Sequence, residues 1–137
     1  MFFQQGMKII SLNMEKNKHE ESVLDLLSKE NADIVCLMEV PDYFLSALEE
    51  IGYHTTFAPM CLQKSDRLFT QGITFATKEK HEAEIFCYHK PKAGIVVHQS
   101  DKVAETVANP IIFADYQNFS VATTHFTWSA NAVEFRG

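Results

Sequence analysis

The sequence predicts a mixed α/β domain that begins with two parallel strands joined by a helix and continues mostly as strands. An uncharged apolar run at residues 34–38 includes two β-branched side chains and suits a strand buried on both faces. A second strand pattern, residues 7–13, precedes it, and an amphipathic segment of helix length separates the two. Because such a crossover joins parallel strands, both strands are expected to end at one rim of a sheet.

Length and composition limit the chain to one domain. With 137 residues, of which 46% are hydrophobic, it is long enough for one core and too short for two. The net charge of −6 argues against a general nucleic-acid coat, although a bound divalent cation brings phosphates to an acidic protein. We treat residues 1–137 as a single domain and interpret residues 1–6 as a tag or extension, since Met7 begins the first strand pattern directly.

Cysteine usage and hydropathy favour a cytoplasmic protein. The three cysteines are odd in number and far apart, which favours reduced thiols over a disulfide framework. They are Cys36, Cys61 and Cys87. No apolar run is long enough to span a membrane, and the N-terminus lacks the basic-then-apolar order of a secretory signal. We therefore expect a cytoplasmic location and no membrane span.

The crossover segment predicts a helix over residues 18–30. Asn17 and Glu20 have the spacing of a capping box, and three apolar residues follow on one face of the helix. These are Val23, Leu26 and Leu27. If the strands on either side are parallel, the polar residues that end them, Asn13 and Glu39, lie on the same rim.

A second helix is predicted after the second strand. Pro41 and Asp42 open it, and Gly52 is a suitable terminator. Its apolar face consists of Phe44, Leu45, Leu48 and Ile51. Residues 53–58 then resume an extended pattern, whereas residues 59–70 are polar and are interpreted as an irregular loop near the site.

The second half of the chain has mainly strand composition. Five further strands are predicted from β-branched and aromatic enrichment, the last two joined by a turn at residues 117–118. They span residues 72–78, 84–88, 94–98, 111–116 and 119–126. No internal repeat or linker divides the chain.

Glu39 directly follows the apolar run of residues 34–38, where the buried strand is expected to reach the rim of the sheet. A carboxylate in this position is costly to desolvate without a partner, and this rim is where open α/β sheets bind ligands. A metal ion is one natural partner, because Mg²⁺ takes carboxylate and amide oxygens together with water. The alternative is that Glu39 is merely the first solvated residue of a loop before Pro41.

His125 lies near the end of the last strand pattern. One ring nitrogen can donate a hydrogen bond while the other is held, which suits contact with a phosphoryl group or a leaving oxygen. The alternative is a packing residue beside aromatic neighbours. The other histidines have no metal-ligand spacing and are interpreted as surface or packing residues: His19, His54, His81, His89 and His98.

Four short segments together resemble the endonuclease/exonuclease/phosphatase superfamily. They occur in the order and approximate spacing of the N-terminal half of that family, at residues 11–13, 33–39, 72–78 and 123–126. The resemblance implies part of a four-layered α/β sandwich. It also implies hydrolysis of phosphate esters with Mg²⁺ or Mn²⁺, on nucleic acids, phosphorylated small molecules or lipid headgroups.

The resemblance assigns roles to three residues. Glu39 matches the metal-binding glutamate, Asn13 the asparagine at the end of the first strand, and His125 the active-site histidine. Glu39 and Asn13 are therefore expected at the metal, and all three in catalysis. Two positions depart from the family pattern: Met38 stands where many members have glutamine, and Thr123 where many have asparagine, which leaves the subfamily open.

The later motifs of the family have no match in this sequence. Neither Gly-Asp-x-Asn nor a terminal Asp-His pair is present, and residues 130–137 look like the start of the helix after the histidine motif. We therefore expect an incomplete domain, truncated after its first half and inactive alone. The alternative function is a non-catalytic binding module, because half of a two-sheet sandwich exposes apolar sheet surface, which also favours self-association.

Overall fold

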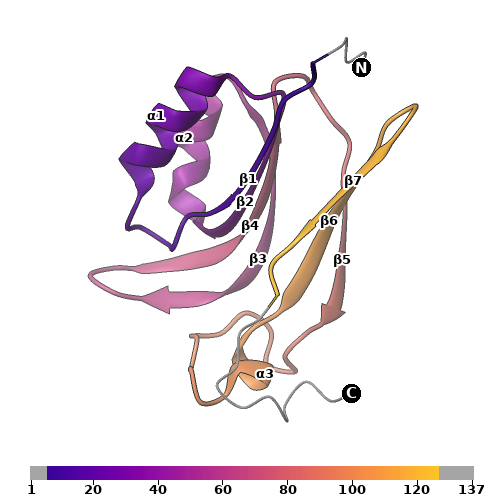
Figure 1. Ribbon diagram of the computed structural model, residues 1–137. Helices are drawn as coiled ribbons and strands as arrows, with labels where there is room; N and C mark the ends of the chain where they lie inside the picture. Colours follow the sequence, from indigo (N-terminus) through magenta and orange to yellow (C-terminus); the bar gives the residue numbers. More distant parts are fainter. Residues whose placement is uncertain (1–5, 127–137) are drawn as a thin grey trace.

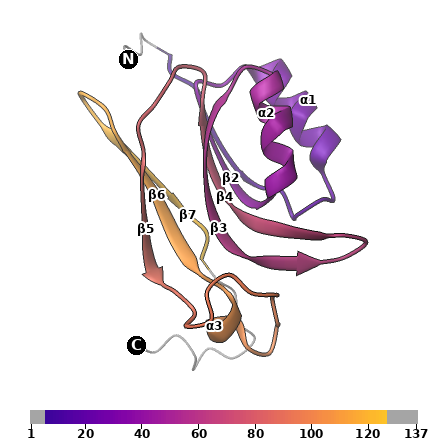
Figure 2. The same cartoon turned by 180° about the vertical axis from the view of Figure 1, so that it is seen from behind.

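The computed structural model describes residues 6–126, which form three layers (Figures 1 and 2). A four-stranded sheet of order β1-β2-β4-β3 lies between a layer of helices and a three-stranded sheet of order β5-β6-β7. One apolar core fills the space between the helices and the first sheet, and a second core lies between the two sheets. The predicted α/β class is confirmed.

The first two strands are parallel, as predicted. β1 (Ile9–Asn13) and β2 (Ile34–Pro41) are separated in sequence by α1 (Glu20–Glu30), and the register places Asn13 opposite Met38. Both strands therefore end at the same rim of the sheet. β2 is buried along most of its length, because the helices cover one face and the second sheet covers the other.

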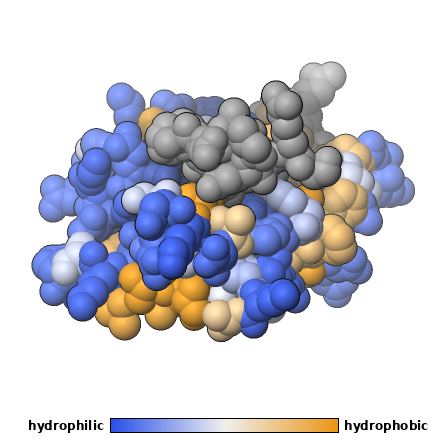
Figure 3. Space-filling view, turned by 90° about the horizontal axis from the view of Figure 1, so that it is seen from below, coloured by the Kyte–Doolittle hydropathy of each residue, from blue (hydrophilic) through white to orange (hydrophobic). Residues whose placement is uncertain are grey.

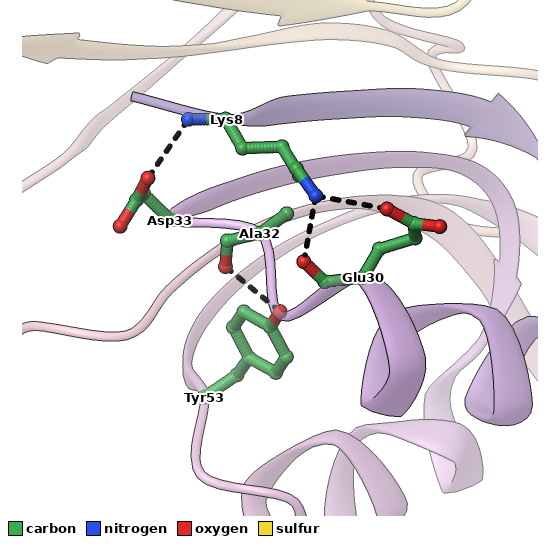
Figure 4. Close-up of polar contacts among 5 residues, drawn as sticks. All are labelled: Lys8, Glu30, Ala32, Asp33 and Tyr53. Atoms are coloured by element: carbon green, nitrogen blue, oxygen red, sulfur yellow. Dashed lines mark hydrogen bonds and ion pairs between the residues drawn. The ribbon is translucent and has the colours of Figure 1, made fainter. Parts of the chain in front are cut away.

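Polar contacts connect the end of α1 to the starts of β1 and β2 (Figure 4). Lys8 Nζ donates to the backbone oxygen of Glu30 at 3.1 Å and lies 2.8 Å from its carboxylate, while the Lys8 backbone N–H donates to Asp33 Oδ2 at 2.8 Å. The Tyr53 hydroxyl donates to the backbone oxygen of Ala32 at 2.8 Å in a buried position. The exposed ion pair contributes little, whereas the buried bond contributes about 1 kcal/mol.

α1 begins later than predicted, and the capping box at Asn17 is wrong. The N-cap is His19, which makes no side-chain capping bond. Instead, Asn13 Oδ1 accepts a hydrogen bond from the Glu15 backbone N–H at 2.8 Å, and Glu15 and Lys16 take φ values of 52° and 65°. The Lys16 backbone N–H donates to a backbone oxygen of β2 at 3.0 Å. This turn holds the chain against β2 and delays the start of the helix.

The second predicted helix is present in two parts. A 3-10 turn, η1 (Asp42–Phe44), continues into α2 (Leu45–Glu50), and Gly52 follows at a φ of 101°, consistent with its predicted role as terminator. Phe44 and Leu48 are buried in the core that α1 also contacts. Pro41 is the last residue of β2 and precedes the helix.

Residues 59–70, predicted as an irregular loop, form most of a long hairpin. β3 (His54–Lys64) and β4 (Leu68–Thr77) pair antiparallel along nearly their whole length, so that prediction is wrong. β3 is an edge strand, which tolerates the missing N–H of Pro59. This segment is rich in polar residues because the hairpin projects beyond the helices into solvent (Figure 1).

The second sheet confirms that the second half is mainly β. It consists of β5 (Glu84–His89), β6 (Asn109–Asp115) and β7 (Ser120–Thr124), all antiparallel. Residues 94–98, predicted as a strand, form only one isolated bridge, between Leu62 and Val97. The short helix α3 (Val103–Thr106), which the sequence did not predict, precedes β6.

The two faces of the second sheet differ. Ile112 and Ala114 of β6 pack against the first sheet, whereas Phe86 and Phe113 are 65% and 40% exposed. Over the described residues the three cysteines are free, as predicted. None of the helices described is long and apolar enough to cross a bilayer.

Candidate active site

Glu39 lies in a β-bulge near the end of β2. The ladder between β2 and β4 shifts between Leu37 and Val40, so Met38 and Glu39 together face a single residue of β4. Glu39 has a φ of 54°, in the left-handed region that residues with a side chain seldom occupy. A bulge changes the direction of a side chain relative to the regular alternation of the strand, and here the Glu39 side chain lines a pocket between the sheets.

A second bulge lies on the other side of β4, at the same level. The ladder between β3 and β4 shifts between Pro59 and Cys61. Gly72 lies between the two bulges, where an added Cβ would be 2.2 Å from the backbone oxygen of Ala58 and 2.7 Å from the Phe57 ring. Only glycine therefore allows β3 to approach β4 this closely.

His125 follows β7 and reaches the same pocket from the second sheet. Its Nε2 lies 3.9 Å from Glu39 Oε1, and the two side chains are 21% and 22% exposed. This distance is too long for a hydrogen bond but close enough for one small group to contact both. His125 Nδ1 is buried and has no hydrogen-bond partner within residues 6–126.

The pocket has a volume of about 170 Å³ and is lined by both apolar and polar side chains. It lies between the two sheets. Seen from below, hydrophobic and hydrophilic groups are interspersed over this end of the molecule (Figure 3). Its lining residues are Lys16, Glu39, Met60, Cys61, Gln63, Gln71, His98, Val107 and His125. One acid, one lysine and two histidines therefore face the same space.

Burial shifts the pKa values of two lining residues. It lowers the pKa of His98, an effect that nearby Lys16 strengthens and Glu39 opposes. Burial raises the pKa of the Cys61 thiol to about 11. His98 is therefore mainly neutral at pH 7, and Cys61 is an unreactive thiol.

Asn13 lies at the same rim but does not line the pocket. It is exposed, it pairs with Met38, and its Oδ1 accepts the hydrogen bond from Glu15 that forms the turn before α1. The structure thus brings Glu39 and His125 together directly. Asn13 supports the backbone that leads to Lys16.

Four lining residues were not singled out by the sequence analysis: Lys16, Gln63, Gln71 and His98. Gln71 carried one signal, a polar residue beside the apolar strand pattern of residues 72–78. His98 had none, because it reaches the pocket through a bridge outside the regular sheets. The backbone N–H of His98 donates to the backbone oxygen of Leu62 at 2.9 Å.

The residues at this rim fit a largely hydrated cation. Mg²⁺ keeps several waters and often takes only one or two protein carboxylates. Glu39 places one carboxylate at the pocket, whereas the amide oxygen of Asn13 lies at the same rim outside the pocket lining and accepts the hydrogen bond from Glu15. Residues 6–126 contain no group of three or more His, Cys, Asp or Glu side chains that could enclose a metal ion.

The fold is similar to that of several solved structures. Compared with an endonuclease/exonuclease/phosphatase from Beutenbergia cavernae, the chain has 14% identity and a TM-score of 0.65 over 93% of its length and 40% of that protein. TDP2 from D. rerio, solved with a single-strand DNA product, has 16% identity with the chain and a TM-score of 0.57, over 94% of the chain and 49% of TDP2. An AP endonuclease from Archaeoglobus fulgidus has 19% identity with the chain and a TM-score of 0.52, over 87% of the chain and 40% of the endonuclease.

The comparisons define the fold of this chain. No family model and no curated protein matches the sequence. The structures establish that the chain has the endonuclease/exonuclease/phosphatase fold, as the sequence resemblance predicted, and that it spans between 40% and 49% of the length of these three proteins.

Proposed function

We propose that this chain carries part of the active site of a metal-dependent phosphoesterase, with Mg²⁺ or Mn²⁺ held at Glu39. The observation that carries the proposal is the approach of Glu39 and His125 to 3.9 Å at a pocket between the two sheets. The nuclease and TDP2 folds among the structural neighbours support the same class of chemistry. The substrate is a phosphate ester.

In this proposal each side chain has a distinct role. Glu39 holds the cation, and Asn13 supplies an amide oxygen at the same rim. A cation bound there offsets negative charge on the phosphoryl group. His125 Nε2 donates to a phosphoryl oxygen or to the leaving oxygen, since this nitrogen lies nearest Glu39.

The proposal is tested by binding of a phosphodiester. Bis(4-nitrophenyl) phosphate is titrated into the protein with Mg²⁺, and binding is followed by amide chemical shifts, while release of nitrophenolate reports any hydrolysis. We expect Mg²⁺-dependent binding that Glu39→Ala and His125→Ala both abolish. The matched control is Glu49→Ala, an exposed carboxylate on α2. Binding that is absent from the wild type, or unchanged in both variants, would overturn the proposal.

A second candidate function is a non-catalytic interaction module. It is favoured by Phe86 and Phe113, which are exposed on the second sheet. Contiguous apolar sheet surface commonly binds a partner or a second copy of the chain. The two functions are distinguished by the titration above, because a binding module has no need of Glu39 or His125.

A further inference from the structure

Gln71 is a buried glutamine on the inner face of β4, in a place where an apolar residue would suit the fold better. It is 5% exposed and pairs with Pro41 of β2 and with Cys61 of β3. Ile73 and Phe75, on the same face of the strand, belong to the apolar core between the sheets. Gln71 precedes these two apolar residues on the same face of β4, and it lines the same pocket as Glu39 and His125.

The side-chain oxygen of Gln71 is buried and has no hydrogen-bond partner within residues 6–126. Such an acceptor destabilises a folded protein unless a donor reaches it. The other glutamine of the lining, Gln63, donates instead to Cys61 Sγ at 3.7 Å. Its amide thus has a partner within the protein, whereas the Gln71 acceptor is free to bind a ligand.

We infer that Gln71 positions the alcohol part of the substrate, by accepting a hydrogen bond from a hydroxyl next to the phosphate ester. This inference rests on the proposed function. Ionised phosphoryl oxygens only accept hydrogen bonds, so an acceptor such as Gln71 Oε1 has to bind another part of the ligand. Gln71, Glu39 and His125 line the same pocket of about 170 Å³, so a hydroxyl on a neighbouring carbon can face Gln71 while the phosphoryl group lies near the other two residues.

The predicted specificity is for phosphate esters of polyols and sugars over esters of simple alcohols. A site that leaves a buried polar group unpaired when the hydroxyl is missing discriminates strongly between the two kinds of ligand. Gln71 is therefore a specificity-determining residue. Chemistry at phosphorus belongs to Glu39 and His125.

The test compares two phosphate monoesters of the same carbon number. Glycerol 3-phosphate and propyl phosphate are titrated with Mg²⁺ present, and each dissociation constant is measured from amide chemical shifts. The wild type is expected to bind glycerol 3-phosphate about 10-fold more tightly. In Gln71→Met, which keeps the side-chain length and removes the acceptor, the two affinities are expected to be equal. The control is Gln117→Met, at an exposed glutamine in the turn between β6 and β7, which is expected to keep the preference.

Thermal unfolding without ligand separates a binding role from a structural one. Because Gln71→Met removes an unpaired buried acceptor, its Tm is expected to equal or exceed that of the wild type. A lower Tm, equal affinities in the wild type, or a preference that survives Gln71→Met would each overturn the inference. If both esters bind equally and Glu39→Ala abolishes binding, the inference fails and the proposed function stands. If neither ester binds, both fail.

Discussion

Glu39 Oε1 and His125 Nε2 lie 3.9 Å apart although Glu39 is in the first sheet and His125 follows the last strand of the second. Glu39 is in a bulge of β2, and His125 directly follows β7. The distance between them therefore depends on how the two sheets pack. Ile112 and Ala114 of the second sheet are part of the core between the sheets. Substitutions in that core will change the site without touching either residue.

Divalent metal is expected to bind weakly, with Glu39 as its one carboxylate ligand. One carboxylate gives little charge with which to hold a cation that dehydrates reluctantly. Calorimetric titration with Mn²⁺ should give weak binding in the wild type, none in Glu39→Ala, and unchanged binding in Glu49→Ala. Tight binding that persists in Glu39→Ala would contradict the assignment.

Residues 1–137, purified alone, are expected to show negligible hydrolysis of a generic phosphodiester with Mn²⁺. Phosphoryl transfer depends on several groups that position water and phosphate, and within residues 6–126 only Glu39 supplies a carboxylate to the pocket. The rates of the wild type, Glu39→Ala and His125→Ala should all equal the background rate. A measurable rate that either substitution abolishes would mean that these residues already contain a complete catalytic set.

The exposed face of the second sheet is expected to cause self-association. Phe86 and Phe113 together present apolar surface that a second copy would bury. Light scattering should give a mass above that of the monomer, and Phe86→Lys should shift it toward the monomer. Leu26→Lys, at a partly exposed apolar residue on α1, is the control and should leave the mass unchanged. A wild type that is monomeric at all concentrations would disprove this prediction.

Gly72→Ala is expected to destabilise the fold by about 3 kcal/mol, because a Cβ would be 2.2 Å from the backbone oxygen of Ala58. Backbone on the adjacent strand cannot move aside as a flexible side chain can. Chemical denaturation measures the free energy of unfolding. Thr70→Ala, also in β4 but half-buried, should cost less than about 1 kcal/mol. Equal losses for the two variants would show that β3 adjusts easily.

His81 is expected to make the fold less stable in acid. Its ring nitrogens lie 2.7 Å from Thr56 Oγ1 and 2.6 Å from Thr77 Oγ1, and burial, reinforced by the charge of His54, lowers its pKa below 6.5. The unfolded chain therefore binds a proton more readily, so the free energy of unfolding decreases as the pH falls below about 6.5.

This prediction is checked by measuring the free energy of unfolding at pH about 7.5 and about 5.5. His81→Gln, which keeps polar contacts without a titrating ring, should lose less stability than the wild type over this range. His19→Gln, at the exposed start of α1, controls for the removal of a histidine. An identical pH dependence in His81→Gln and the wild type would refute the role of His81.

Local sequence patterns were sufficient for the elements in which one periodicity covers the whole segment. The apolar run of β2, the crossover through α1 and the turn between β6 and β7 were each predictable, because burial on known faces requires those patterns. The rim position of Glu39 followed from the same reasoning. Polar composition was misleading for the β3–β4 hairpin, since strands that project into solvent carry polar residues without losing their hydrogen bonds.

Long-range packing determined the rest of the site. The bulge at Glu39, the close approach at Gly72 and the distance from Glu39 to His125 result from strands that pair or pack across large separations in sequence. Gln71 and His98 join the pocket for the same reason. Side-chain periodicity predicts which face of a strand is buried. It carries no information about which residues of two different sheets meet, because that depends on bulges and on the packing of the core between them.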